Sequence, residues 1–204
     1  MKTVVVSQRA IGLPERPEIY DGVDRALSRY LVSLGLLPVP VPNGLDPAGG
    51  SEMFHLWLKS VQPSGFILSG GGDVTNDEAR NAVEDGLLTL AELHQMPVLG
   101  ICRGAQKLAV RAGGTLTREE NHVGVSTILV SEFDFSPGAC FHDFAIDGTP
   151  KGYATIAQTE EGRTEAFQHR SLPWAGVMWH PERQRVSDPK LLEYLHQTFH
   201  GESP

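Results

Sequence analysis

Cys102 lies between two glycines in the pattern Gly-x-Cys-x-Gly, which is typical of a nucleophile at a sharp turn from a strand into a helix. Gly100 and Gly104 suit such a turn, because the backbone bends too tightly and passes too near its neighbours for a Cβ atom. The next segment, 103–111, is predicted to be a helix. Cys102 would then lie at the helix N-terminus, where the positive end of the helix dipole favours thiolate over thiol. We therefore expect Cys102 to be a nucleophile.

A thiolate that cleaves an amide needs a group that protonates the departing nitrogen, and His180 with Glu182 can supply it. Pro181 disfavours helical backbone at His180 and favours an extended conformation, in which residues two apart project to the same side. Glu182 is thus expected to hold the ring while the imidazole moves the proton. The order Cys, His, Glu predicts a triad that tertiary structure assembles.

A run of glycines in 69–73 follows the apolar strand predicted at 65–68. Glycines leave backbone N–H groups uncovered, so the N–H of Gly71 and that of Arg103 are expected to form an oxyanion hole. Two other interpretations are weaker. A core role for Cys102 would not require flanking glycines, and a phosphate-binding role for the glycine run would call for the spacing G-x-G-x-x-G.

Together these motifs resemble those of the class I glutamine amidotransferase family, and specifically its γ-glutamyl-γ-aminobutyrate hydrolase branch. The resemblance rests on Gly-Ile-Cys-Arg-Gly-x-Gln, the upstream Ser-Gly-Gly-x-Asp and the downstream Gly-x-x-Trp-His-Pro-Glu, and it spans residues 4 to about 199. The sequence His-Pro-Glu-Arg and residues 7–9 are similar to the subgroup that cleaves γ-glutamyl-CDP-amidate in capsule phosphoramidate biosynthesis.

The resemblance implies a role for individual residues. Cys102 would be the nucleophile, His180 the base and Glu182 the orienting acid, with Gly71 and Arg103 as oxyanion donors. Residues implied to contact the glutamyl group are Gly70, Gln106, Cys140, Phe141 and His142. Ala139 and Cys140 stand where relatives usually carry Asn and Ser, so this loop would bind through its main chain, and packing is the expected role of the Cys140 side chain.

The expected reaction is hydrolysis of a γ-glutamyl amide or phosphoramide through a γ-glutamyl thioester, without a metal or organic cofactor. Arg9 and Arg16 are candidates to hold an anionic leaving group, since they lie in a loop after the first strand. The alternative, which is the more common one for arginines in such loops, is that both are solvated surface residues. One alternative is a glutaminase subunit that supplies ammonia to a partner synthetase. Another is a binding module or thiol sensor without catalytic activity. His196 and His200 lack the acidic partner of a helical zinc motif.

Composition fits a soluble cytosolic enzyme of one domain, and the resemblance implies that its substrate is a small molecule. The net charge of −8 argues against nonspecific binding to nucleic acid and to anionic membranes. The length favours one hydrolase domain over residues 1–204. The chain has two cysteines and shows no targeting or membrane segment, so we expect both thiols to be reduced and the protein to be cytoplasmic, with a homodimer as one possible assembly.

The elements that must position these residues alternate between apolar strands and amphipathic helices, which predicts an α/β fold with a mostly parallel sheet. The resemblance specifies a flavodoxin-like three-layer sandwich with a small antiparallel excursion. Strands are expected at 3–7, 37–41, 66–69, 96–101 and 174–179, helices at 20–34, 77–94, 103–111 and 188–200, and antiparallel strands at 124–130, 141–146, 152–158 and 164–169. Loops are expected at 9–17 and 43–51, and Glu165 is expected at the surface.

Overall fold

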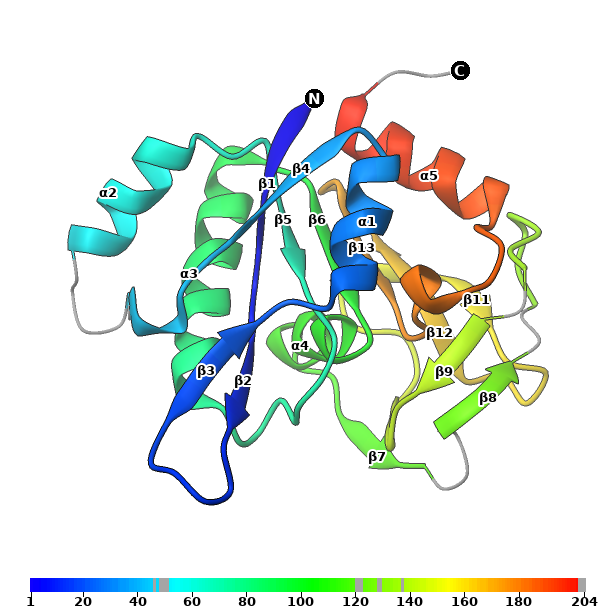
Figure 1. The fold of residues 1–204 in the computed structure, drawn as a ribbon. Helices are drawn as coiled ribbons and strands as arrows, with labels where there is room; N and C mark the ends of the chain where they lie inside the picture. The colour runs from blue at the N-terminus through cyan, green and yellow to red at the C-terminus, as the bar shows by residue number, and fades with distance from the viewer. Residues whose placement is uncertain (46, 48–51, 120–122, 128–129, 137, 202–204) are drawn as a thin grey trace.

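A twisted sheet forms the centre of the protein in the computed structural model, which describes residues 1–45, 47, 52–119, 123–127, 130–136 and 138–201 (Figure 1). Its parallel strands follow one another in the order β4-β1-β5-β6-β13. Their bounds are Leu36–Pro40, Lys2–Val6, Gly65–Leu68, Val98–Ile101 and Trp174–Val177. This is the strand order of flavodoxin-like folds. The predicted fold class is confirmed.

Antiparallel strands extend the sheet beyond β13. The order continues through β12 and β10 to β7, and β11 pairs with β12 outside this path. Their bounds are Thr164–His169, Phe144–Ile146, Leu116–Arg118 and Tyr153–Gln158. The antiparallel excursion predicted for the second half of the chain is therefore present, although the expected strand at 141–146 is divided between β9 (Gly138–Phe141) and β10.

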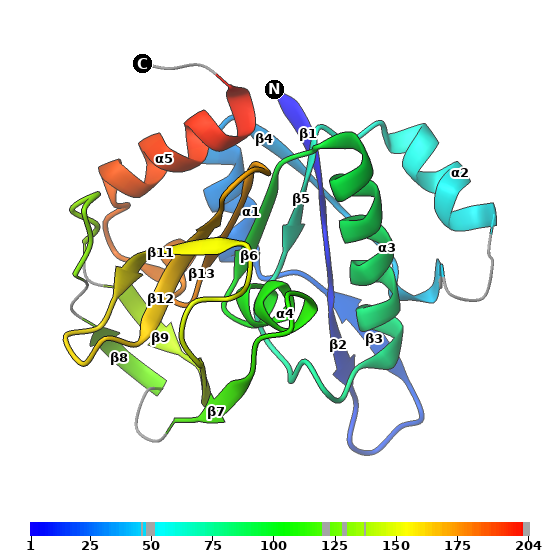
Figure 2. The same cartoon turned by 180° about the vertical axis from the view of Figure 1, so that it is seen from behind.

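Helices cover both faces of the sheet, as Figures 1 and 2 show from opposite sides. Val4 and Val6 of β1 pack with helices α1 and α5, whereas Val5 packs with α2, α3 and α4. The helices are Arg25–Ser33, Glu52–Val61, Glu78–His94, Arg103–Arg111 and Pro189–His200 in chain order. Successive strand residues thus enter opposite layers, which is why the central strands are apolar throughout. No helix among the described residues is long and apolar enough to cross a membrane.

Two hairpins lie outside the main sheet. Strands β2 (Arg9–Gly12) and β3 (Ile19–Gly22) form the first, and β8 (Val123–Thr127) and β9 form the second. The first hairpin corrects the prediction that 9–17 is a loop and that the helix extends back to Tyr20. Tyr20 lies in β3 and is largely exposed, and the helix begins only after its N-cap, Asp24.

The remaining elements bring further corrections and confirmations. Helix α2 was not predicted, and the segment 43–51 contains a short 3₁₀ turn, η1 (Asn43–Leu45), in the part that the structure describes. The sequence leaves Asn76 and Asp77 as alternative N-caps of α3. In the structure Asp77 accepts a hydrogen bond from the backbone N–H of Arg80, and Asp188 caps α5 in the same way. These caps explain why both helices begin where the sequence indicated.

Candidate active site

Cys102 lies where β6 turns into α4, at the carboxyl edge of the sheet. Its backbone is strained, with φ 51° and ψ −105°, and its N–H donates to Val177 O at 2.7 Å. The flanking glycines are required by close contacts. A Cβ at Gly100 would lie 2.6 Å from the backbone of Gly104, and a Cβ at Gly104 would lie 2.0 Å from Leu68 O. The turn that the Gly-x-Cys-x-Gly pattern predicted is therefore present.

His180 follows β13 and is almost fully buried. Its backbone N–H donates to Ala139 O at 2.9 Å, and its Nδ1 lies 2.6 Å from Oε1 of Glu182. Burial alone would lower the pKa of His180, but hydrogen bonds with Cys102 and Glu182, together with the Coulombic effect of both groups, raise it to about 9. The imidazole thus lies between Cys102 and Glu182 and favours the protonated state near neutral pH.

The local geometry that joins His180 to Glu182 differs from the predicted one. His180 is close to extended, with φ −106° and ψ 87°, as expected before a proline. Residues Pro181–Arg183, however, form a 3₁₀ turn, η3, rather than a continued extended chain. The predicted contact is present, but the turn and not the alternation of a strand brings the carboxylate to the ring.

The glycine run after β5 lies against the predicted triad. A Cβ at Gly70 would be 2.6 Å from His180 Cε1 and 3.5 Å from Cys102 Cβ, so only glycine fits there. Gly71 has φ 86° and Gly72 has φ 81°, a region that side chains disfavour. Gly70, Gly71 and Arg103, the residues predicted to bind substrate or to donate to an oxyanion, therefore adjoin Cys102 in space or in sequence.

A buried arginine holds this glycine loop from behind. Arg80 Nη1 donates to Gly71 O at 2.7 Å, and Nη2 donates to Ser69 O and to Ser69 Oγ. The two anchored carbonyls lie on either side of the peptide that joins Gly70 to Gly71, and this peptide carries the N–H of Gly71. Arg80 therefore restricts the direction in which the Gly71 N–H can point.

Glu84 links Arg80 to the other predicted oxyanion donor. Its Oε1 accepts from Arg80 Nε at 2.9 Å and from Ser7 Oγ at 2.8 Å, and its Oε2 accepts from Arg103 Nη1. Burial would raise the pKa of the Glu84 carboxyl, but the charges of Arg80 and Arg103 and the hydrogen bonds from Arg103 and Ser7 hold it below the ordinary value. The Arg103 side chain is thus engaged in this network, so the predicted oxyanion role falls to its backbone N–H.

Two cavities among the described residues meet at His180. The Cys102 cavity, of about 350 Å³, is lined by Cys102, Gln106, Phe141 and His142. The hairpin cavity, of about 250 Å³, is lined by Ile11 and Gly22 of the first hairpin, by Asp24 and by Gly70 and Glu182. Residues that line both are Arg9, Gly71, His180 and Arg183.

Cationic side chains stand at the junction of the two cavities. Arg9 lies over the glycine loop, because a Cβ at Gly71 would be 3.3 Å from Arg9 Nη1. Arg183 lies over the Phe141 ring, 5.0 Å from its centroid, and its Nη2 is 3.4 Å from Asp24 Oδ2. No role was predicted for Arg183, although its place next to Glu182 was a usable signal.

In the loop predicted to bind the glutamyl group, some side chains line the Cys102 cavity and others are buried away from it. The Phe141 ring contacts the His180 ring edge-on at 5.7 Å, and Gln106 Nε2 donates to Phe144 O at 3.0 Å. The Cys140 side chain is fully buried and does not line the Cys102 cavity, so its predicted contact with substrate could be made only through the main chain. His142 lines that cavity but is itself buried.

Other candidates lie away from the site. Arg16 is exposed in the turn of the first hairpin and does not line either cavity. The rings of His196 and His200 are stacked 4.2 Å apart, and His200 Nε2 is 3.1 Å from Leu34 O. Arg16 is thus separated from Arg9 by the length of the hairpin, and His200 has a structural contact with helix α1.

Known proteins resemble this chain in sequence and in fold. The γ-glutamyl-CDP-amidate hydrolase of Campylobacter jejuni is 32% identical over 153 residues, which are 72% of each chain. A GMP synthase of Leifsonia xyli is 30% identical over 69% of this chain, but the match spans only 30% of the synthase. The solved structure of a GMP synthase subunit from Thermoplasma acidophilum, described as putative, superposes with a TM-score of 0.69 at 17% identity, over 98% of this chain and 94% of that one.

A family model adds to these pairwise similarities. The model described as glutamine amidotransferase class-I matches residues 17–198, a span that contains the cysteine turn, the glycine run and the His-Pro-Glu segment. This match covers most of the chain and agrees with the fold and with the placement of the triad. The chain therefore belongs to the class I glutamine amidotransferase family.

Proposed function

We propose that this protein hydrolyses the bond between the γ-carbonyl carbon of a glutamyl group and a nitrogen atom, with Cys102 as nucleophile. The observation that carries the proposal is the position of His180. Its imidazole borders both cavities and lies between Cys102 and Glu182. A substrate whose glutamyl group occupies the Cys102 cavity would place its leaving nitrogen at the junction, beside the proton that His180 carries.

The reaction would proceed in two steps. Cys102 Sγ attacks the γ-carbonyl, the C–N bond breaks and the nitrogen takes the proton from His180, which leaves a γ-glutamyl thioester. Water then attacks the thioester, gives its proton to His180, and glutamate leaves as the C–S bond breaks. The N–H groups of Gly71 and Arg103 would stabilise the oxyanion in both steps, a contribution typically worth a hundredfold to a thousandfold per donor. Glu182 would fix the ring and stabilise its charge.

For the leaving group we favour an N-phosphoryl nitrogen, as in γ-glutamyl-CDP-amidate. The Campylobacter relative carries this substrate in its name. Arg9 and Arg183 also favour it, since guanidinium groups at the junction suit phosphate oxygens beside the scissile nitrogen. A γ-glutamyl amine such as γ-glutamyl-γ-aminobutyrate would be hydrolysed by the same chemistry, but its leaving group has no phosphate for the two arginines to bind. The proposal takes residues 1–204 as one hydrolase domain that acts on a small molecule in the cytoplasm.

A second candidate is a glutaminase that supplies ammonia to a synthetase. The Leifsonia relative, a GMP synthase, favours it. Ammonia carries no charge to be bound, however, and would not call for arginines at the hairpin cavity. Steady-state hydrolysis by the isolated protein separates the two. The hydrolase should turn over γ-glutamyl-CDP-amidate without a partner and prefer it to glutamine, whereas the glutaminase should prefer glutamine and show low activity alone.

The nucleophile is tested by Cys102→Ala. We expect glutamate release from γ-glutamyl-CDP-amidate or γ-glutamyl-γ-aminobutyrate to fall by at least about 10⁴-fold, while calorimetry detects substrate binding within a few-fold of wild type. In the wild type, a glutamine-like chloroketone should label Cys102 and spare the buried Cys140 in peptide mass maps. Undiminished turnover in Cys102→Ala, or labelling confined to Cys140, would refute the assignment.

A further inference from the structure

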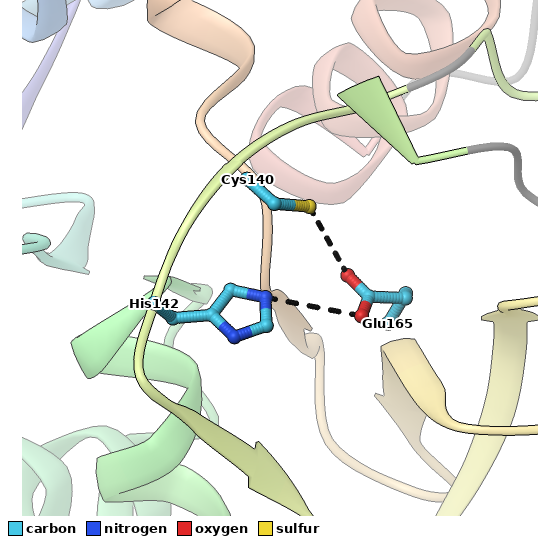
Figure 3. Close-up of side chains that lie close together, drawn as sticks. All are labelled: Cys140, His142 and Glu165. Atoms are coloured by element: carbon cyan, nitrogen blue, oxygen red, sulfur yellow. Dashed lines mark hydrogen bonds and ion pairs between the residues drawn. The ribbon is translucent and has the colours of Figure 1, made fainter. Parts of the chain in front are cut away.

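We propose that Cys140, His142 and Glu165 form a site for a zinc-like divalent cation, separate from the proposed catalytic thiol. The three side chains converge from β9, from the residues that follow β9 and from β12 (Figure 3). Their candidate ligand atoms all lie within 4.8 Å of one another. The site would be structural and would not enter the reaction proposed above.

Two distances within this cluster are close to those between the ligands of a small tetrahedral ion. Cys140 Sγ is 3.7 Å from Glu165 Oε2, and His142 Nε2 is 3.8 Å from Glu165 Oε1. Zinc bonds of about 2.3 Å to sulfur and about 2.0 Å to nitrogen or oxygen place neighbouring tetrahedral ligands roughly 3.3–3.6 Å apart. The two distances end on different oxygens of Glu165, and one ligand atom from each residue lies within 4.8 Å of the others. Binding of one ion would therefore require the side chains to close by up to about 1.3 Å, with water as the fourth ligand.

The donor set selects the metal. Thiolate sulfur and imidazole nitrogen favour zinc and related borderline-soft ions, whereas magnesium and calcium take oxygen ligands. All three side chains are at most 3% exposed. A dication held by the thiolate and the carboxylate would neutralise two anionic ligands in a buried place, where an unpaired charge is costly. This burial corrects the expectation that Glu165 lies at the surface.

A second carboxylate, that of Glu119, lies near the other ring nitrogen of His142. His142 Nδ1 is 3.6 Å from Oε2 of Glu119, and Glu119 is in turn paired with Arg163. Ligating histidines commonly present one nitrogen to the metal and the other to a carboxylate, which fixes the tautomer and the ring direction. His142, with Nε2 toward Glu165 and Nδ1 toward Glu119, has this arrangement.

The site has an entrance and a structural consequence. His142 also lines the Cys102 cavity, so an ion would reach the three residues from that side. Ala139, beside Cys140, accepts the backbone hydrogen bond of His180. A bound metal would thus tie β12 to the strand that supports the triad. The sequence offered no spacing signal, because Glu165 comes from a strand far along the chain.

The test must separate this site from Cys102 and His180, which also pair a thiol with an imidazole. The chain has two cysteines, so Cys102→Ser leaves Cys140 as its only thiol. We expect wild type and Cys102→Ser to bind one equivalent of Zn²⁺ in competition with a chromophoric chelator. We also expect Co²⁺-loaded Cys102→Ser to show a thiolate-to-cobalt charge-transfer band. Cys140→Ser should lose that band and bind Zn²⁺ at least about tenfold more weakly.

Opposite results would overturn the proposal. They are the absence of the cobalt band in Cys102→Ser, Zn²⁺ affinity in wild type weaker than about 1 mM, or Zn²⁺ affinity that depends on Cys102 and is unchanged in Cys140→Ser. Because Cys140→Ser could misfold, the decisive measurement is the cobalt spectrum of Cys102→Ser. An unchanged circular dichroism spectrum is enough to show that Cys102→Ser is folded. Metal binding is measured apart from turnover, so its failure would leave the proposed hydrolase intact.

Discussion

The proton on His180 sets the pH range in which the proposed chemistry can run. Its pKa of about 9 results from Cys102 and Glu182 outweighing the effect of burial. Since the pKa is raised from 6.5, the proton's contribution to stability is complete below pH 6.5 and is lost as pH rises to about 9. The protonated ring is also the acid that the leaving nitrogen needs. Turnover should therefore decline as pH rises through about 9.

Glu182→Gln tests this account. The substitution removes a negative charge 2.6 Å from Nδ1, so the alkaline limb of kcat/KM should move to lower pH and kcat should fall by up to about 10⁴-fold. Glu193→Gln, on the exposed side of α5, is the matched control and should leave the profile unchanged. An alkaline limb that stays in place in Glu182→Gln would contradict the proposed role of Glu182.

Sequence patterns predicted single residues well where the reason was local. Gly100 and Gly104 were identified because a tight turn requires glycine, and the contacts agree. Patterns failed where the role of a side chain depends on its contact with a distant element of the fold. Arg183 follows the predicted triad, yet nothing in the sequence indicates that it lies over Phe141. Glu165 was expected at the surface because charged residues usually lie there, and the sequence pattern does not indicate that it is buried.

At the scale of the element, α3 packs its apolar face against the sheet and also supplies buried charged residues. Arg80 and Glu84 lie one helical turn apart, a spacing that usually indicates a modest surface pair worth a few tenths of a kcal/mol. Here both are buried, and together they connect the glycine loop after β5 to the start of α4. The helix thus joins the two segments that carry the proposed oxyanion donors.

Adjacent acids on α3 give a matched test of this network. Glu84→Gln leaves two buried guanidinium groups without their shared carboxylate, so we expect a loss of about 3–5 kcal/mol in the free energy of unfolding in urea and a fall in kcat. Asp85→Asn removes a half-exposed partner of Lys107 and should cost less than about 1 kcal/mol. Similar losses of unfolding free energy in both variants would show that the buried Glu84 contributes no more to stability than the half-exposed Asp85.

Element prediction succeeded in the sheet and failed at its margins. The central strands and α3, α4 and α5 were predicted because their apolar residues are buried in regular patterns, and a side chain also caps α3 and α5. The first hairpin was missed because Ile11 and Tyr20 are exposed, so its strands have no buried face and no clear alternation. Helix α2 was missed for a similar reason, since Met53 and Leu56 are exposed on it and blur its amphipathic pattern.

At the scale of the molecule, the site is assembled from distant parts of the chain. The segments after β1, β5, β6 and β13 meet at one edge because parallel strands share the same carboxyl end, and the sequence predicted that edge. What it could not predict is the wall that would face the leaving group in the proposed reaction. That wall combines the N-terminal hairpin with the turn after β13, and loop conformation decides which side chains it presents.

Substrate selection across this wall can be tested with two arginines of the same hairpin. Arg9 lies at the junction of the cavities, whereas Arg16 lies in the exposed turn. Arg9→Met keeps most of the side-chain volume and removes the charge. We expect it to raise KM for γ-glutamyl-CDP-amidate by about tenfold, because one charge-assisted hydrogen bond is worth about 1.5–3 kcal/mol and solvent screens part of it.

The comparison substrate and the control variant decide what that change means. With γ-glutamyl-γ-aminobutyrate, whose leaving group lacks the phosphate, Arg9→Met should change KM less than about threefold. Arg16→Met should resemble wild type on both substrates, since its charge lies away from the cavities. Equal effects of the two variants would indicate a diffuse electrostatic influence of the hairpin. A loss in Arg9→Met that is the same for both substrates would place Arg9 on the glutamyl side of the scissile bond and remove the support that it gives to a phosphorylated leaving group.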